Sequence, residues 1–245
     1  MSWPNRESGV TLMELLIAMT LMSLLSVGIV MSLRVGLSAM TKTDTKLMAN
    51  RRVVSVERIL EQEISSAMPV TADCLSPGEA PPARIAFFQG EAASMRLASS
   101  FSLQEGTRGI PMILEYQVIP GEQGQGVRLV VNEHWYTGPR GAGQFCLGMG
   151  ADPLTGTPAP QFPPIQVGAA SFVLADKLAY CRFSYRDVVP APELERWILR
   201  WIKPVLPSAV RVEMAPLIPD SSRLEPVTLT VPIRVTRLTL EPYDN

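Results

Sequence analysis

Glu14 is the residue of this sequence whose position most needs a chemical explanation. It stands near the start of an apolar stretch, GVTLMELLIAMTLMSLLSVGIVMSL, which runs from Gly9 to Leu33. An ionised carboxylate at the centre of a bilayer costs about 2.5–3.5 kcal/mol even on lenient insertion scales. A carboxylate in this stretch therefore needs a charged partner or a functional reason.

Catalysis by an imidazole or an activated nucleophile has little support. His134 is the only histidine, and it lies in a predicted strand between Glu133 and Trp135. Serine or cysteine catalysis would depend on this one side chain, and the sequence has no G-x-S-x-G elbow, H-E-x-x-H helix or phosphate-binding loop. We expect a structural histidine in a protein that is not an enzyme, with no cofactor and no small-molecule substrate.

The cysteines do not form a metal-binding pattern. Cys74, Cys146 and Cys181 lie far apart with no C-x-x-C pair, so zinc ligation by thiolates is not expected. In an oxidising compartment two of the three would pair, but the sequence does not select which two, and buried free thiols are an equal alternative. Asp152 has no D-x-D-x-D-G loop around it. We therefore predict no calcium site and no metal.

The element that positions Glu14 is a helix long enough to span a membrane. At about 1.5 Å per residue, residues 10–33 cross a hydrocarbon core of roughly 30 Å. Its polar residues Thr20, Ser23 and Ser26 can bond preceding backbone carbonyls in a helix. A cleaved signal peptide would have a shorter apolar centre and a more basic start. An ordinary single-span anchor is the simpler alternative, but it leaves Glu14 unexplained.

The helix is predicted to continue as an amphipathic stem. Apolar residues recur at three- and four-residue steps as far as Met68, and charged residues that include Glu61 and Glu63 occupy the other positions. Pro69 is expected to end the helix, because the residue before a proline resists helical angles. We expect the apolar stripe to pack against the rest of the chain.

The remainder, residues 69–245, reads as one antiparallel β-rich head, so the predicted fold class is α+β. Residues 111–119 and 127–136 form a predicted hairpin; the glycines of 121–126 between them lack the helix and lysine of a phosphate loop. Residues 138–168 contain so many glycines and prolines that we expect a long irregular loop. This loop is our candidate contact surface.

Charge excludes one class of partner. The chain has 22 basic and 23 acidic residues and a formal net charge of −1. It has no basic cluster with interleaved aromatic residues, so we expect no binding to nucleic acid.

Residues 9–16, GVTLMELL, closely resemble the cleavage and methylation signature of type IV prepilins and type II secretion pseudopilins. The resemblance implies that a prepilin peptidase cuts after Gly9, that residues 1–9 are a leader, and that Val10 becomes the N-methylated first residue. The family usually has Phe where this chain has Val10. Glu14 would then neutralise the N-terminal ammonium of an adjoining subunit in a filament core and so set the subunit register.

The pilin-like resemblance also implies a topology. Residues 10–34 would span the inner membrane or line a filament core, 35–68 would form the stem, and 69–245 a periplasmic head with the N-terminus in the cytoplasm. The basic residues after the span favour the opposite orientation by the positive-inside rule. We expect the orientation that the processing signature implies, with the N-terminus in the cytoplasm and the head in the periplasm.

The C-terminal part resembles J-type minor pseudopilins of the general secretion pathway. The similar runs are CRFSYRD, ERWILRW, LPSAVRVEM and PVTLTVPIRV, within residues 181–235. The resemblance implies a pseudopilus tip complex with I-type and K-type minor pseudopilins, on a major pseudopilin filament, that supports export of folded proteins across the outer membrane. Two alternatives stay open: a minor pilin of a type IV pilus or competence machine, and a single-pass envelope-anchored binding domain.

Overall fold

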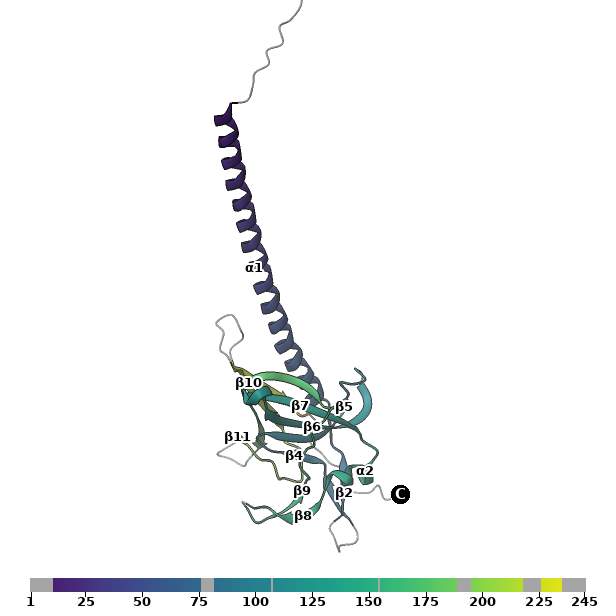
Figure 1. The fold of residues 1–245 in the computed structure, drawn as a ribbon. Helices are drawn as coiled ribbons and strands as arrows, with labels where there is room; N and C mark the ends of the chain where they lie inside the picture. The colour runs from purple at the N-terminus through teal and green to yellow at the C-terminus, as the bar shows by residue number, and fades with distance from the viewer. Residues whose placement is uncertain are drawn as a thin grey trace, which may run out of the picture. The chain divides into compact units, whose positions relative to one another are not determined.

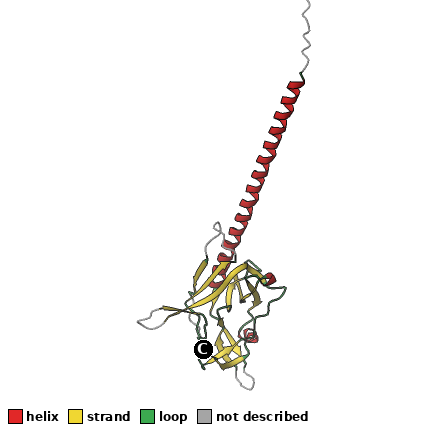
Figure 2. Cartoon of the chain, turned by 60° about the vertical axis from the view of Figure 1, so that its left-hand side comes forward, coloured by secondary structure: helices red, strands yellow, loops and turns green. Residues whose placement is uncertain are grey.

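The computed structural model describes residues 11–75, 82–106, 108–153, 155–188, 195–217 and 226–234; of these, the side chains of 38–54 are not described. The chain divides into two compact units, Met1–Ala49 and Asn50–Asn245, and each is considered by itself. One long helix, α1 (Leu12–Ser65), belongs to both. Figures 1 and 2 show this helix and a head made mainly of strands. The fold is α+β and its architecture is pilin-like, as predicted.

The last turns of α1 are part of the head's core. Val56, Leu60 and Ile64 are buried, in agreement with the predicted apolar stripe. The prediction was wrong for Glu63, which is completely buried rather than on the polar face. The helix also ends at Ser65, before the predicted Met68, because the two residues of β1 (Ala67–Met68) pair with a neighbouring strand.

Nine of the described strands form one antiparallel sheet. Its order is β1-β5-β6-β7-β10-β12-β13, with β4 on β5 and β11 on β10 (Figure 1). The bounds are β4 (Phe88–Gly90), β5 (Ser94–Phe101), β6 (Arg108–Pro120), β7 (Val127–Trp135), β10 (Phe172–Val188), β11 (Glu195–Ile198), β12 (Ala209–Pro216) and β13 (Val227–Pro232).

The predicted hairpin is confirmed by the pairing of β6 with β7. The strands join through a short 3-10 turn, η1 (Glu122–Gly124), and Pro120 lies opposite Val127. Gly124 and Gly126 have φ values of 72° and 64°, which a residue with a Cβ adopts only at a cost. The glycines of this segment therefore close a turn between strands rather than cradle a phosphate.

The sheet has a core on each of its two faces. The larger core packs the last turns of α1 against alternate residues of the central strands, such as Leu97, Leu114 and Val131. Along β10 Cys181, Phe183 and Tyr185 are buried in this core, as predicted, but Ser184, predicted on the opposite side of the strand, is buried as well. The smaller core, on the other face, contains Ala72, Phe87, Ile113 and Ala142.

The segment that covers the second face was predicted wrongly as irregular. Within residues 138–168 the structure has α2 (Pro139–Ala142), a 3-10 turn η2 (Gly143–Phe145), and the paired strands β8 (Gly148–Ala151) and β9 (Pro158–Gln161). The turn between these strands is closed by the Asp152 carboxylate, which accepts a hydrogen bond from the Thr155 N–H at 2.8 Å. Proline is tolerated in β9 because this small sheet has only two strands.

A second small sheet lies beside this segment. It pairs β2 (Thr71–Cys74) with β3 (Ala83–Ala86). The strand predicted from Arg84 to Phe88 is therefore divided at Phe87: its first part pairs with β2, and only β4 pairs with β5. The strands β2, β8 and β9 and helix α2 gather at one end of the head (Figure 1).

Candidate functional site

Glu14 lies in the first turn of α1. Its backbone N–H donates to the carbonyl oxygen of Thr11 at 3.0 Å and to the Thr11 hydroxyl at 3.3 Å, so Thr11 caps the helix. The Glu14 side chain is exposed, and its negative charge suits the positive end of the helix dipole. Gly9 and Val10, the predicted cleavage and methylation residues, lie outside the described part of the chain.

The polar residues after Glu14 bond within the helix, as predicted. The Thr20 hydroxyl donates to the Ile17 carbonyl at 2.9 Å, the Ser23 hydroxyl to the Thr20 carbonyl at 2.9 Å, and the Ser26 hydroxyl to the Met22 carbonyl at 2.8 Å. None of these hydroxyls then needs a partner from water, because each is already satisfied by its own helix.

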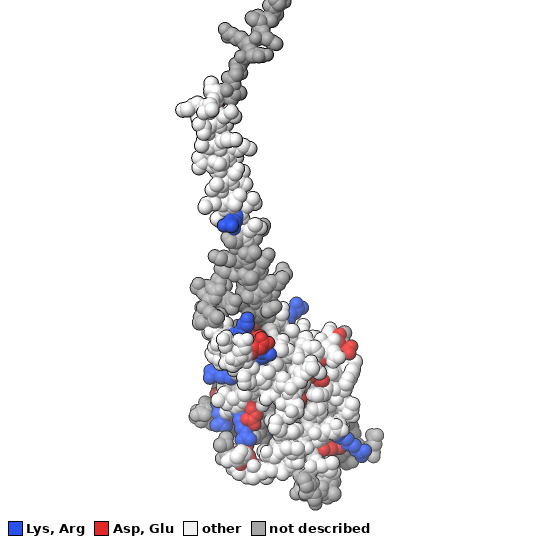
Figure 3. Space-filling model, in the orientation of Figure 1, with Lys and Arg blue, Asp and Glu red and all other residues white. Residues whose placement is uncertain are grey.

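The outer surface of this segment is apolar. Residues Leu12–Leu37 are long and apolar enough to cross a membrane, and none of their side chains is buried within the described structure. On the face shown in Figure 3 the described part of this helix is almost free of acidic and basic side chains, which lie instead over the head. An exposed apolar surface of this extent needs lipid or apolar protein around it.

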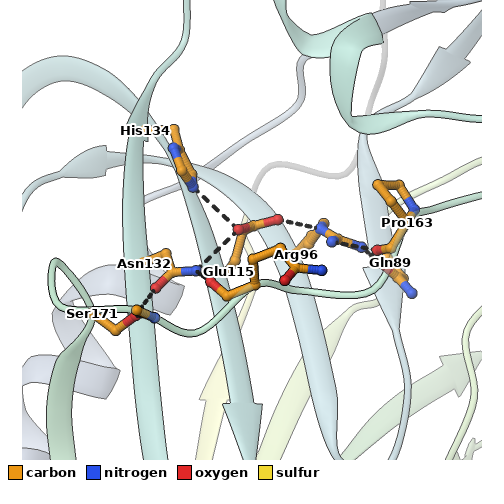
Figure 4. Close-up of polar contacts among 9 residues, drawn as sticks. Gln89, Arg96, Glu115, Asn132, His134, Pro163 and Ser171 are labelled. Atoms are coloured by element: carbon orange, nitrogen blue, oxygen red, sulfur yellow. Dashed lines mark hydrogen bonds and ion pairs between the residues drawn. The ribbon is translucent and has the colours of Figure 1, made fainter.

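In the head, a network of polar side chains, most of them buried, lies across three neighbouring strands (Figure 4). Arg96 on β5, Glu115 on β6 and Asn132 on β7 stand in one row of cross-strand partners. The Arg96 Nε donates to Glu115 Oε1 at 2.6 Å, and the Asn132 amide donates to Glu115 Oε2 at 3.2 Å. His134, also on β7, places its Nε2 3.1 Å from Glu115 Oε2.

This network fastens the end of the covering segment to the sheet. The Arg96 Nη2 donates to the Pro163 carbonyl at 2.6 Å, and the Asn132 amide donates to the Gln166 carbonyl at 2.9 Å. The Ser171 hydroxyl donates to the Asn132 side-chain oxygen at 2.6 Å. The polar groups of the sheet therefore hold residues 163–171 by main-chain and side-chain hydrogen bonds.

The surroundings of Glu115 keep it ionised. Burial alone would raise the pKa of this carboxyl, but the hydrogen bonds from His134 and Arg96 and the positive charge of Arg96 outweigh burial and lower the pKa to about 2. His134 therefore has the structural contact expected for it. It belongs to the group of side chains that holds the Glu115 carboxylate.

The cysteine pairing that the sequence left open is Cys74 with Cys146, which form a disulfide with a Cα–Cα distance of 5.5 Å. The bond joins Cys74, the last residue of β2, to Cys146, which directly follows η2. It therefore links the small β2–β3 sheet to the segment of residues 138–168. Cys181 is a free, buried thiol, and burial raises its pKa to about 12.

Comparison with known families identifies the N-terminus. Residues 4–30 match the prokaryotic N-terminal methylation motif. The N-terminus is that of a pilin-like protein. The match includes Gly9, Val10 and Glu14 and extends through most of the apolar helix, while the head of this pilin-like protein lies outside it. No curated protein matches the sequence.

Two other groups of charged side chains in the head of the pilin-like protein form ion pairs: one is at Asp152, and the other lines a cavity. Asp152 forms an ion pair with Arg200, which also contacts Glu91 at 3.1 Å. Within the described residues no group of three or more His, Cys, Asp or Glu side chains is arranged to hold a metal. A cavity of about 250 Å³ between β4, β9 and residues 200–204 includes Arg200 and Lys203 in its wall, and both are ion-paired.

Sequence reasoning missed the polar groups that matter most in the head. Arg96 and Glu115 were not singled out because their contact depends on the register of β5 against β6. Glu63 was assigned to the polar face of α1 by helical spacing alone. One signal was present for Arg96 and Glu115: each charged residue stands between large apolar or aromatic neighbours, Met95 and Leu97 for Arg96 and Leu114 and Tyr116 for Glu115.

Proposed function

We propose that this pilin-like protein is a J-type minor pseudopilin of a type II secretion system, a component of the pseudopilus tip that helps start assembly and supports export of folded proteins. The observation that carries the proposal is the methylation motif, which extends into a long helix with an apolar first part and is followed by a β-rich head. The J assignment is supported by the similar runs that lie in β10, β11, β12 and β13.

In this proposal Gly9 and Val10 form the cleavage site of the prepilin peptidase, and Val10 carries the methylated amine. Glu14 lies four residues after Val10, about one helical turn away. In a filament core with little water, its carboxylate neutralises the ammonium of the adjoining subunit. A buried charge without its partner is costly, so the pair favours one register of neighbouring helices.

The proposed partners follow from this role. The apolar helix packs against the helices of I-type and K-type minor pseudopilins and the major pseudopilin, and it resides in the inner membrane before assembly. The head lies in the periplasm, where an oxidising environment suits the Cys74–Cys146 disulfide. We propose no catalytic activity, cofactor or nucleic-acid partner.

The first experiment measures the intact mass of the membrane-extracted protein after co-expression with its prepilin peptidase. We expect a chain that begins at Val10, with or without one added methyl group. Gly9→Ala is the control and should remain full length. A full-length wild-type chain, under conditions where the same peptidase cuts another prepilin, would exclude pilin-class processing and favour a plain membrane anchor.

A second experiment separates processing from assembly. Glu14→Ala and the isosteric Glu14→Gln should be cut normally but should co-purify poorly with I-type and K-type partners. A Ser23→Ala variant, which changes a hydroxyl bonded within the helix, should co-purify like the wild type. Normal co-purification of both Glu14 variants would remove the role of Glu14 in register. Stable association with type IV pilus components instead would favour the minor-pilin alternative.

A further inference from the structure

The last turns of α1 contain a carboxyl group with an unusual environment. Glu63 is fully buried in the larger core of the head, next to Leu60 and Ile64. Its Oε2 accepts a hydrogen bond from the Tyr116 hydroxyl, whereas its Oε1 has no hydrogen-bond partner. A carboxylate in this position would keep a full charge in the core with half of its hydrogen bonds unmade.

The strands packed against Glu63 add no positive charge. From β6 it faces Tyr116, and from β7 it faces Glu133, whose own carboxylate accepts hydrogen bonds from the Ser102 hydroxyl and the backbone N–H groups of residues 103 and 104. From β5 the Ser99 hydroxyl donates to the Glu63 carbonyl at 2.8 Å. Among the side chains that the structure describes, none of the ion pairs includes Glu63.

These surroundings favour the protonated carboxyl. Burial raises the pKa of Glu63 to about 8, the hydrogen bond from Tyr116 opposes this rise, and the negative charge of Glu133 adds to it. Glu133 is held in place by its three donors. It therefore acts as a fixed negative charge that disfavours a second one on Glu63.

We infer that the junction between the last turns of α1 and the sheet is a pH-sensitive latch, closed while Glu63 carries a proton and weakened when Glu63 ionises. The apolar contacts of Leu60 and Ile64 hold the helix on the sheet at every pH. Ionisation of Glu63 places a charge between these contacts, and the helix must move to bring that charge to water.

The direction of the pH dependence follows from linkage. The pKa of Glu63 is raised in the folded head, so its contribution to stability is fully present below the ordinary value of 4.5 and is lost as pH rises from there to about 8. Over this window the unfolding constant of the wild type should rise by about tenfold per pH unit relative to a variant without the carboxyl.

The test uses the full chain in detergent, with urea unfolding of the head followed by tryptophan fluorescence between pH 5 and 9. Wild type should lose stability across this range relative to Glu63→Gln, in which the titrating group is absent. Glu61→Gln is the matched control, because Glu61 is exposed on the same helix, and it should keep the wild-type dependence. Equal pH dependence of wild type and Glu63→Gln would overturn the latch.

Substitution of the two neighbours of Glu63, Glu133 and Tyr116, should shift the midpoint of the Glu63 titration in opposite directions. Glu133→Gln removes the like charge, so the midpoint of the Glu63 titration should move to lower pH. Tyr116→Phe removes the hydrogen bond that favours the carboxylate, so the midpoint should move to higher pH. Shifts in the same direction for both variants would contradict the assigned environment.

A direct measurement covers the case in which the variants fold poorly. In wild-type protein with ¹³C-labelled glutamate carboxyl groups, one resonance should titrate near pH 8, and the same resonance should persist in Glu61→Gln. If every glutamate carboxyl titrates below pH 6, Glu63 is ionised in the core and the latch does not exist. None of these outcomes depends on the cleavage after Gly9 or on the choice of secretion machine.

Discussion

Arg96 and Glu115 face each other across β5 and β6, with Arg96 Nε 2.6 Å from Glu115 Oε1 and with 1% and 5% of the two residues exposed. A pair of charges this deeply buried is held by its additional hydrogen bonds as much as by mutual attraction. Here those bonds come from His134 and Asn132 on one side and from the covering segment on the other. The pair thus connects the sheet to residues 163–171.

Breaking this pair should destabilise the head strongly. Arg96→Met leaves the Glu115 carboxylate buried without its cation, and we expect a loss of about 3–5 kcal/mol in the free energy of unfolding. The double variant Arg96→Met/Glu115→Met should be more stable than Arg96→Met alone, because it removes both charges. Urea unfolding measures the free energy of unfolding of the single and the double variant. The exposed pair Arg182–Glu213 is the control, and Arg182→Met should have a much smaller effect.

Acid should weaken the head through Glu115. Its pKa is lowered to about 2 in the folded protein, so its contribution to stability is present above the ordinary value of 4.5 and is lost as pH falls from there to about 2. Wild type should therefore lose more stability than Glu115→Gln over this range. Parallel acid-unfolding curves for the two proteins would show that Glu115 has an ordinary pKa.

Reduction of the disulfide should also destabilise the head. Cys74 and Cys146 are separated by 72 residues, and closing a loop of this size stabilises a fold by about 4 kcal/mol. We expect a reductant to lower the unfolding midpoint of wild type but not that of Cys74→Ser/Cys146→Ser. Under non-reducing conditions alkylation should modify Cys181 alone, and only after unfolding, since this thiol is buried. Two alkylated cysteines in the oxidised protein would contradict the pairing.

Gly90 should not tolerate a side chain. A Cβ at this position would lie 2.6 Å from Tyr185 Cζ and 2.9 Å from Trp201 Cβ, where β4 meets residue 201 in an isolated bridge. Gly90→Ala should cost about 1–3 kcal/mol in thermal or urea unfolding, as overpacking does in cores. Gly168→Ala has open space around the new methyl group and is the matched control. Equal stability of both variants would show that Tyr185 and Trp201 can move aside.

The parts of the fold that the sequence predicted are those specified by local pattern. The apolar run with Thr20, Ser23 and Ser26 forms a helix with internal hydroxyl bonds, and the alternation of Cys181, Phe183 and Tyr185 forms a half-buried strand. These patterns depend on residues a few positions apart. Secondary structure of this kind follows from the chemistry of neighbours.

The parts that could not be predicted depend on residues far apart in the chain. Glu63 has the spacing of a solvent-facing residue, and only the position of Tyr116, 53 residues later, shows that it points into the core. The strands within 138–168 were missed because glycine and proline usually mark loops, whereas here the disulfide at Cys146 and the turn at Asp152 hold short strands in place.

The internal bonding of Thr20, Ser23 and Ser26 affects how the first helix changes its surroundings. With these three hydroxyls bonded to carbonyls of their own helix, this part of the helix offers its neighbours a mainly hydrocarbon surface. Exchange of lipid tails for the side chains of another apolar helix then breaks no hydrogen bond and exposes no donor. Transfer of this segment from a bilayer to a protein bundle, which the proposed function requires, would then depend on shape complementarity and on the single carboxylate at its end rather than on these three hydroxyls.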